Sequence, residues 1–378
     1  MTDPNSQSNE KPQHEPGEET RRHIAVLSQQ AYQLLRENFV EEANEKFREI
    51  LEYDDTNNYA LVGLGDAARK KGQCPRALEY YKRCLEHHPT NNYALFGLAE
   101  CYKNMKQYHR AIDAWEKYLH HDNQNVTVLT RVADAHRKVK NFDRSKELYD
   151  RVLELEENNA YAIIGLAHLY YGFRDYQNAL AYWQRMLELS GSNVDIRVLT
   201  SLGNCHRKLK QFQDAIRYFE RALEREPNNF YALFGLGDAY RGIGRPEDAL
   251  AYWNQILSRD EKNRIILTRA GDAYRAVGNP EQAEEYYRKA LNIEFDPYAV
   301  LGLALLSMDE GRYEEAATSL EGLIPNTPGN SRVYQKLADC YIKLGQKAKA
   351  ISLLESFPRR GKRNRKIDDT LERIRRGH

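Results

Sequence analysis

Cysteines and histidines are the residues of this 378-residue chain that could ligate a metal or act as nucleophiles. The five cysteines (Cys74, Cys84, Cys101, Cys205 and Cys340) are odd in number, and no two of them lie two or four residues apart. This pattern argues against a disulfide framework or a zinc knuckle and predicts reduced thiols in a core. The pairs His87-His88 and His120-His121 are adjacent in sequence, and adjacent side chains point apart on a helix. We therefore expect no metal site there.

Motifs that hold phosphate groups or catalytic zinc are missing from the sequence. It contains no GxxxxGKS or GxxxxGKT and no HExxH. The repeats described below leave only residues 1–23 and 358–378 outside them, which is too little for a catalytic domain. We therefore expect a protein that is not an enzyme and that needs no cofactor.

Composition and charge favour a soluble folded protein. Hydrophobic residues make up 41% and charged residues 29%, and the formal net charge is +1, which is too small for a chain that binds polyanions as a whole. Residues 1–23 are polar and lack the apolar segment of a secretory signal. The longest uncharged apolar stretch, Tyr298–Met308, is too short to cross a bilayer. These features predict a cytoplasmic protein without a membrane partner.

A period of about 34 residues dominates the chain, and such a period indicates a repeat architecture. A small residue recurs in steps of 34, interrupted by one step of 36 and one of 33, at Ala43, Ala77, Ala111, Ser145, Ala179, Ala215, Ala249, Ala283, Ala316 and Ala350. The ten repeats span residues 24–57, 58–91, 92–125, 126–159, 160–195, 196–229, 230–263, 264–296, 297–330 and 331–357. Residues 1–23 would form a disordered polar N-terminus, and residues 358–378 a basic tail with a capping helix.

Within a repeat, the spacing of small and bulky residues predicts two antiparallel helices. In residues 230–263, Leu233 and Leu236 share one helical face, Gly244 ends the first helix, and Pro246 lies near the start of the second. A small residue at position eight and an aromatic residue at position 24, here Trp253, recur through the repeats. A bulky ring beside a small residue allows close helix packing, so we expect these positions to form the core. His136 and His206, at position eleven, are expected to be core histidines.

This pattern resembles the tetratricopeptide repeat across roughly nine-tenths of the chain. The resemblance implies an all-α, right-handed superhelix of about ten helical hairpins, in which the first helices line a concave groove. It also implies a non-catalytic scaffold or adaptor that binds a peptide segment or a helix of one or more partner proteins. Positions two, five, nine and twelve of the first helices would then face the groove, and we refer to them as the groove positions.

The groove positions offer tyrosines, acids and bases, and two of the first helices offer apolar strips. The predicted peptide-binding residues are Tyr161, Ile164, Tyr171, Tyr231, Phe234, Asp238, Arg241, Asp272, Arg275, Tyr298, Leu301, Leu305 and Met308. Exposed apolar surface usually marks an interaction site, so the strip Tyr298, Leu301, Leu305 and Met308 is the sharpest prediction. Its alternative is cover by the last helix, which carries Ile367, Leu371 and Ile374 on one face.

Two further features of the groove positions have two readings each. An acid at position nine precedes a base at position twelve, so the charges either neutralise one another along the helix or serve a peptide. The tyrosines at position two either capture a ligand or pack between neighbouring first helices.

The repeats also alternate in type from the third onward. One type carries glycine at position six, as in Gly97, Gly165, Gly235 and Gly302, and the other carries Arg131, Ser201 or Arg269 there. Trp115, Trp183 and Trp253 all fall in the first type. Duplication of a two-hairpin block explains this alternation, and a ligand of matching period is the alternative.

The basic tail raises an alternative function, association with RNA or another nucleic acid. Arg359, Arg360, Lys362, Arg363, Arg365 and Lys366 form a basic run that could contact phosphate. The repeats themselves carry 44 basic and 47 acidic residues, which disfavours this reading. We expect a monomer, although the end faces of stacked repeats leave self-association open.

Overall fold

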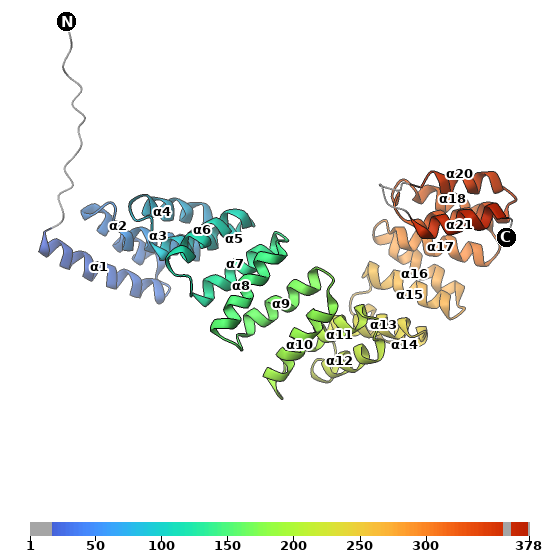
Figure 1. Cartoon of the computed structure of the whole chain (residues 1–378), viewed down its shortest axis with the longest axis horizontal. Helices are drawn as coiled ribbons and strands as arrows, with labels where there is room; N and C mark the ends of the chain where they lie inside the picture. The colour runs from blue at the N-terminus through green and yellow to red at the C-terminus, as the bar shows by residue number, and fades with distance from the viewer. Residues whose placement is uncertain (1–16, 358–363, 377–378) are drawn as a thin grey trace, which may run out of the picture. The chain divides into compact units, whose positions relative to one another are not determined.

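The computed structural model describes residues 17–357 and 364–376, and every regular element in these ranges is an α-helix. The chain divides into two compact halves, one through Leu189 and one from Ser190 onward. Each half is an array of helical hairpins in which consecutive helices pack side by side (Figure 1). The prediction of an all-α solenoid of helical hairpins is therefore confirmed.

The helices of the N-terminal half are α1 (Glu18–Arg36), α2 (Val40–Tyr53), α3 (Asn58–Lys70), α4 (Cys74–His87), α5 (Asn92–Asn104), α6 (Tyr108–His121), α7 (Val126–Lys138), α8 (Phe142–Leu155), α9 (Ala160–Gly172) and α10 (Tyr176–Ser190). Helix α1 begins six residues before the boundary predicted at residue 24, so residues 18–23 are helical where the sequence analysis expected a disordered terminus. Residues 1–16 lie outside the described part of the chain.

The helices of the C-terminal half are α11 (Ile196–Lys208), α12 (Phe212–Arg225), α13 (Phe230–Gly242), α14 (Pro246–Leu257), α15 (Arg264–Ala276), α16 (Pro280–Ile293), α17 (Pro297–Asp309), α18 (Tyr313–Leu323), α19 (Ser331–Lys343), α20 (Lys347–Glu355) and α21 (Arg365–Arg376). Helix α21 packs against α19 and α20. It caps the last hairpin, as predicted, by burying Ile367, Leu371 and Ile374.

Local signals in the sequence start and stop these helices. Asparagine caps many of the first helices; the Asn91 side chain, for example, accepts a hydrogen bond from the Ala94 N–H at 2.9 Å. The turn inside a hairpin needs one residue with positive φ, and Gly244 supplies it with φ of 80°. Lys106 adopts the same conformation with φ of 59°, so glycine is favoured at this turn but not required.

The predicted core positions are buried. Trp115, Trp253 and Tyr287, at position 24, are fully enclosed, as are the alanines at position eight that the structure describes. Glycine at position six lets the ring of the preceding hairpin approach closely: a Cβ on Gly302 would lie 2.3 Å from a carbon of the Tyr287 ring. Glycine at position six is thus a packing requirement where the preceding hairpin carries tyrosine or phenylalanine at position 24, because the ring fills the space that a side chain would need.

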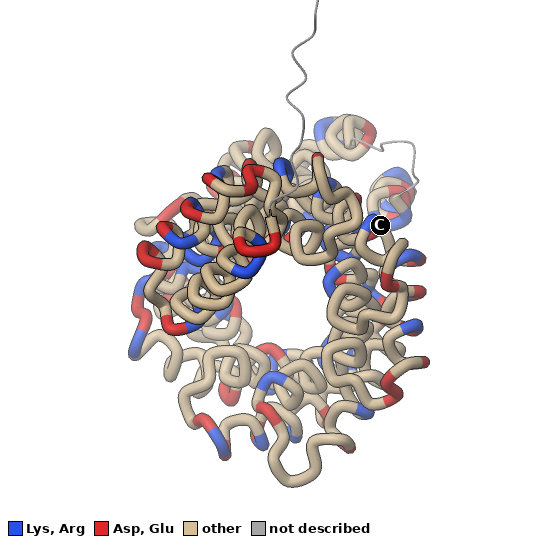
Figure 2. The backbone as a smooth tube through the Cα atoms, turned by 90° about the vertical axis from the view of Figure 1, so that its left-hand side faces the viewer, with Lys and Arg blue, Asp and Glu red and all other residues tan. Residues whose placement is uncertain are grey.

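Basic and acidic residues are both spread over the backbone that Figure 2 shows. Within the ranges that the structure describes, no helix combines the length and hydropathy that crossing a bilayer requires.

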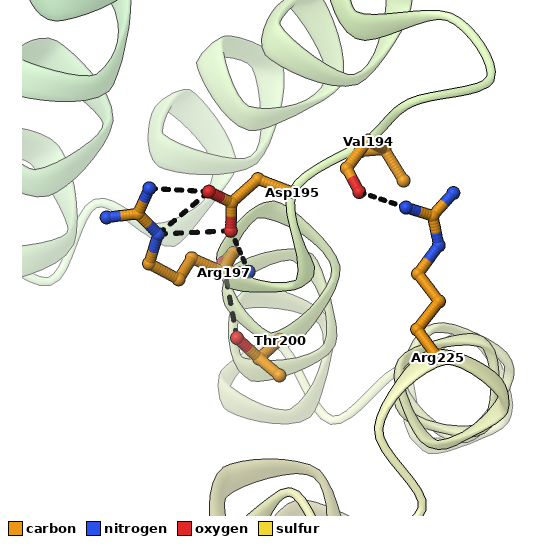
Figure 3. A network of polar contacts seen from close by, with 5 residues as sticks. All are labelled: Val194, Asp195, Arg197, Thr200 and Arg225. Carbon is orange, nitrogen blue, oxygen red and sulfur yellow. Dashed lines mark hydrogen bonds and ion pairs between the residues drawn. The ribbon is translucent and has the colours of Figure 1, made fainter.

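The two extra residues of the fifth repeat form a loop that is held at the start of the C-terminal half. Asp195 caps α11 by accepting from the Arg197 N–H at 2.8 Å, and it also binds the Arg197 guanidinium (Figure 3). The hydrogen bond from the Arg197 guanidinium lowers the pKa of Asp195, and the bond from the Arg197 N–H adds to this. Arg225 of α12 donates to the backbone carbonyl of Val194. The insertion is therefore fastened to the following hairpin by polar contacts.

Candidate functional site

The tyrosines at position two of the first helices are exposed to solvent. The exposed fractions are 60% for Tyr59, 79% for Tyr93, 77% for Tyr161, 66% for Tyr231 and 63% for Tyr298. They are the second residues of α3, α5, α9, α13 and α17. Such exposure contradicts the alternative that these rings pack between neighbouring first helices.

Many acids at position nine are neutralised locally. The Arg69 and Arg137 guanidinium groups bind Asp66 and Asp134 on their own helices at 3.0 and 2.8 Å. The aromatic residue at position 24 adds a second donor, since the Tyr149 hydroxyl donates to Asp134 at 2.7 Å. Burial, together with the Asp134 carboxylate, raises the pKa of Tyr149, so this hydroxyl stays protonated and keeps donating. In these hairpins the charges at positions nine and twelve neutralise one another along the helix.

The pairing within a helix fails at Asp272 and Arg275. The Asp272 carboxylate accepts from the Tyr287 hydroxyl at 2.8 Å, whereas Arg275 binds Asp309 of the following first helix at 3.0 Å. Both Asp272 and Arg275 are half-buried. The expectation that each acid pairs with the base three residues later therefore holds for some repeats only.

Asp238 is the exception among the acids, because three arginines surround it. Its carboxylate lies 2.7 Å from Arg207 of α11 and 3.4 Å from Arg241 of α13, and it also binds Arg269 of α15. The aromatic residue of this hairpin is Trp253, whose ring N–H is buried and finds no partner. Since no tyrosine hydroxyl serves Asp238, basic side chains from three successive first helices do. We call Asp238, Arg207, Arg241 and Arg269 the arginine cluster.

Aromatic side chains adjoin the arginine cluster. The Arg269 and Arg207 guanidinium carbons lie 4.8 and 6.0 Å from the centre of the Phe234 ring, within the range of cation–π contacts. The Phe234 ring stacks on Phe230 with a centroid separation of 6.0 Å. Phe230 and its neighbour Tyr231 are exposed, so the cluster borders an apolar surface that solvent reaches.

The apolar strip on α17 is largely buried, so the prediction that it is exposed was wrong. Leu301 and Leu305 are only 4% and 6% exposed, and Met308 packs against the same core. This core also contains Leu337 of α19 and the three apolar residues of α21. The physical reason is that the last hairpins and the capping helix use the leucines to close their own core. Of the strip, only Tyr298 remains exposed.

The fifth repeat keeps part of its predicted surface. Tyr161 is exposed, Ile164 is half-buried, and the half-buried Tyr171 ring contacts Tyr176 edge to face at 5.2 Å. His168, also at a groove position, contacts the buried Trp183 ring at 5.0 Å. This face offers aromatic and aliphatic contact area.

The chemistry-bearing residues named first are core residues for the most part. All five cysteines are buried and free, and burial raises the pKa of the Cys205 thiol to about 12. His136 and His206 are buried as predicted, and burial lowers the pKa of His136 although Glu116 opposes this. The rings of His120 and His121 lie 5.6 Å apart edge to face, closer than expected for side chains that point apart.

Most of the basic run lies outside the described residues. Arg359, Arg360, Lys362 and Arg363 lie outside the described residues, and Arg365 and Lys366 form the start of α21. The described residues therefore provide no observation in favour of nucleic-acid binding.

Comparison with known families identifies the repeat. Models described as tetratricopeptide repeat match residues 68–130, 131–194, 196–229, 218–251, 237–300, 268–331 and 307–374. The chain belongs to the tetratricopeptide repeat family. No curated protein sequence matches it.

Solved structures of other tetratricopeptide repeat proteins resemble this fold. Yeast Tom70 is 13% identical, with 94% of this chain and 96% of that chain covered and a TM-score of 0.50. PilF of Pseudomonas aeruginosa is 18% identical over 57% of this chain and 97% of its own, with a TM-score of 0.47. YrrB, described as having an unusual peptide-binding site, is 24% identical over 50% of this chain and 97% of its own, with a TM-score of 0.43. At these identities the likeness concerns the fold alone.

Reasoning from the sequence missed two members of the arginine cluster as site residues, Arg207 and Arg269. A signal for Arg269 was present in the alternation of repeat types. The repeat after the one with Trp253 carries arginine, and not glycine, at position six. Arg131 has the equivalent place after the Trp115 repeat, and its guanidinium lies 3.4 Å from Glu100. In the Trp115 and Trp253 repeats, tryptophan at position 24 thus coincides with arginine from the next repeat near the acid at position nine. The Trp183 repeat has His168 at position nine and is followed by Ser201.

Proposed function

We propose that the chain is a non-catalytic scaffold whose groove positions hold a peptide segment or a helix of a partner protein. The exposed tyrosines at position two support this proposal most directly. A tyrosine ring that stays in solvent in the free protein offers a large contact area and a hydroxyl, with few rotatable bonds to immobilise on binding. The same residue type at the same position of five first helices gives a peptide several equivalent contacts.

Charged residues near these rings would add orientation to the contact area. Asp238 and Arg241 lie on α13 with Tyr231, while Asp134 and Arg137 provide a paired acid and base on α7. Buried or half-buried charges that already have partners contribute specificity more than affinity, since a mismatched partner leaves a charge unpaired. A protein ligand that presents both apolar and charged side chains suits such a surface.

A display experiment tests the proposal without knowledge of the partner. A library of random twelve-residue peptides is panned against the intact protein, and recovered peptides are then titrated against variants by fluorescence anisotropy. We expect the double variants Tyr93→Ser/Tyr161→Ser and Tyr231→Ser/Tyr298→Ser to weaken binding of the peptides that each half selects by at least about tenfold. Aromatic hot-spot residues contribute about 2 kcal/mol or more, which corresponds to a loss of that size.

Matched controls come from exposed apolar residues at the ends of second helices. Tyr53 is the last residue of α2 and Ile293 the last of α16, and both are exposed. Tyr53→Ser and Ile293→Ser should leave binding unchanged. Equal binding by the tyrosine variants and the controls, with helicity intact, would refute the proposal.

A further inference from the structure

The arginine cluster carries more positive charge than its structural role requires. Other position-nine acids have fewer basic partners: the Tyr287 hydroxyl holds Asp272, and Arg69 together with the Tyr81 hydroxyl holds Asp66. Glu100 and Asp339 have two bases each. Around Asp238, three guanidinium groups face one carboxylate that is 6% exposed. The cluster therefore has two positive charges in excess of its own acid.

Two buried donors of the cluster are left without partners. The Nε–H groups of Arg207 and Arg269 are buried and make no hydrogen bond in the described structure. An arginine can donate five hydrogen bonds, and buried donors without acceptors cost free energy. Crowding has an electrostatic consequence as well: burial lowers the pKa of Arg269, and the neighbouring Arg241 and Arg207 lower it further although Asp238 opposes them. The site would thus gain from another acceptor with negative charge.

The surroundings of the cluster limit the kind of anion that fits. Phe234 lies against Arg207 and Arg269, and exposed Phe230 and Tyr231 extend the apolar surface. The acids Asp272 and Asp309 belong to the next first helices, α15 and α17, so a chain of phosphates that continued past the cluster would meet negative charge. One negative charge beside an apolar group matches these neighbours better than a polyanion does.

We infer that the arginine cluster on α11, α13 and α15 binds the carboxylate of an aspartate or glutamate in a partner peptide, with an adjacent aromatic or aliphatic residue of that peptide on Phe230, Tyr231 and Phe234. This inference rests on the proposed peptide-binding function and adds to it a ligand class and a position. Guanidinium groups suit this role because their planar donors match a carboxylate in a bidentate pair. Asp238 holds the arginines in place for the incoming acid.

Side-chain NMR of the full chain tests the inference with defined probes. The protein is labelled with ¹⁵N-arginine, and the Nε–H signals are followed during titration with the capped peptide acetyl-Gly-Phe-Glu-Gly-amide. Its glutamine counterpart, acetyl-Gly-Phe-Gln-Gly-amide, is the matched ligand control. We expect saturable shifts of the Arg207 and Arg269 signals with the glutamate peptide, at least about tenfold weaker binding of the glutamine peptide, and weakening as salt rises.

Arginine variants assign the effect to the cluster. Arg207→Gln and Arg269→Gln each leave Asp238 with two basic partners, so the fold should persist, and each should weaken the glutamate peptide at least about fivefold. Arg221 is the matched control because it also lies over an aromatic ring, Tyr218 at 5.9 Å, but belongs to the second helix α12. Arg221→Gln should bind like the unaltered protein. Circular dichroism verifies that each variant is folded.

The outcomes separate this inference from the proposed function. Equal binding of the glutamate and glutamine peptides, or arginine signals that do not shift, would overturn the carboxylate site even if the tyrosine variants had abolished capture of display peptides. Shifts of the same signals by a twelve-residue oligouridine at lower concentration than by the peptide would overturn it in favour of nucleic acid. If the display experiment failed and the NMR titration was positive, the tyrosine surface would be refuted as a peptide-binding surface, while the anion site would still be supported.

Discussion

Helices α13 and α17 open with nearly the same residues but lie in different surroundings. Helix α13 reads Tyr231-Ala232-Leu233-Phe234-Gly235-Leu236, and α17 reads Tyr298-Ala299-Val300-Leu301-Gly302-Leu303. In both, the tyrosine is exposed and the glycine admits an aromatic ring of the preceding hairpin. At position five the helices differ: Phe234 lies half-buried against two arginines, whereas Leu301 is enclosed in an apolar core.

The difference comes from the helices that follow. After α13, helix α15 brings Arg269 next to Phe234 and Asp238. After α17, helix α19 and the capping helix bring apolar side chains, among them Leu337 and Leu371, into the core that holds Leu301. A groove position is thus open or closed according to the next hairpin, so the side chain itself does not decide whether it is available to a ligand. We therefore expect changes at enclosed and at open positions of such helices to differ in their effect on the free energy of unfolding.

A charge at Leu301 should produce the largest effect. Leu301→Asp places a carboxylate among apolar side chains where it has no partner, and we expect the free energy of unfolding to fall by about 4 kcal/mol. Hydrogen exchange of the amides in α17–α19 and urea denaturation measure this loss. Tyr298→Asp, on the same helix but exposed, should change stability by no more than about 0.5 kcal/mol. Intact stability of Leu301→Asp would mean that the strip is open after all.

Periodicity predicted the hairpins but could not predict which strips they cover. The spacing of small and aromatic residues fixed the repeats because each ring needs a small neighbour, and Trp253 and Tyr287 are buried as that rule requires. Leu301 belongs to a core that also contains residues of α21, and α21 lies beyond the last repeat and obeys no repeat spacing. Helix α1 likewise extends to Glu18, because its first turn carries acids favourable at a helix N-terminus and not the pattern of the repeat.

The contacts around Asp238 were outside the reach of single-helix reasoning as well. The sequence suggested a pair between Asp238 and Arg241, three residues apart, and this contact exists at 3.4 Å. The closer contact with Arg207, and that with Arg269, join residues 31 positions apart on neighbouring first helices. Such contacts depend on how adjacent hairpins stack, which a single sequence shows only through its alternation.

Loss of the Asp238 carboxylate should rank second in effect. Asp238→Ala leaves three arginines of the cluster without their shared acid, and removal of one partner from a buried ion pair is strongly destabilising. We expect a loss of about 3 kcal/mol, reduced from the upper range because the arginines are partly exposed and can be hydrated. Urea denaturation and hydrogen exchange in α11–α15 provide the measurement.

Two further measurements test whether the arginines depend on Asp238. The ¹⁵N-arginine Nε–H signals of Arg207 and Arg269 should lose their dispersion in Asp238→Ala, because the side chains no longer have a fixed acceptor. High salt should restore part of the stability by screening the repulsion among the guanidinium groups. A variant as stable as the unaltered protein at low salt would show that the arginines find other acceptors, and the arrangement around Asp238 would then not be what holds α11, α13 and α15 together.

The smallest effect on stability is expected for loss of the Tyr287 hydroxyl, a group that the Trp253 hairpin lacks. Tyr287→Phe removes the donor to Asp272 at 2.8 Å and keeps the ring that fills the space beside Gly302. Because Asp272 is half-buried and water can replace the hydroxyl, we expect a loss of about 1 kcal/mol. Tyr298→Phe, which removes an exposed hydroxyl, should be neutral in the same denaturation experiment. If Tyr287→Phe were also neutral, the tyrosine hydroxyl would contribute nothing to holding the acid, and the contrast with the Trp253 hairpin would rest on charge alone. A loss near the expected value would instead show that tyrosine and arginine are two ways to hold an acid at position nine, of which only the second leaves charge available to a ligand.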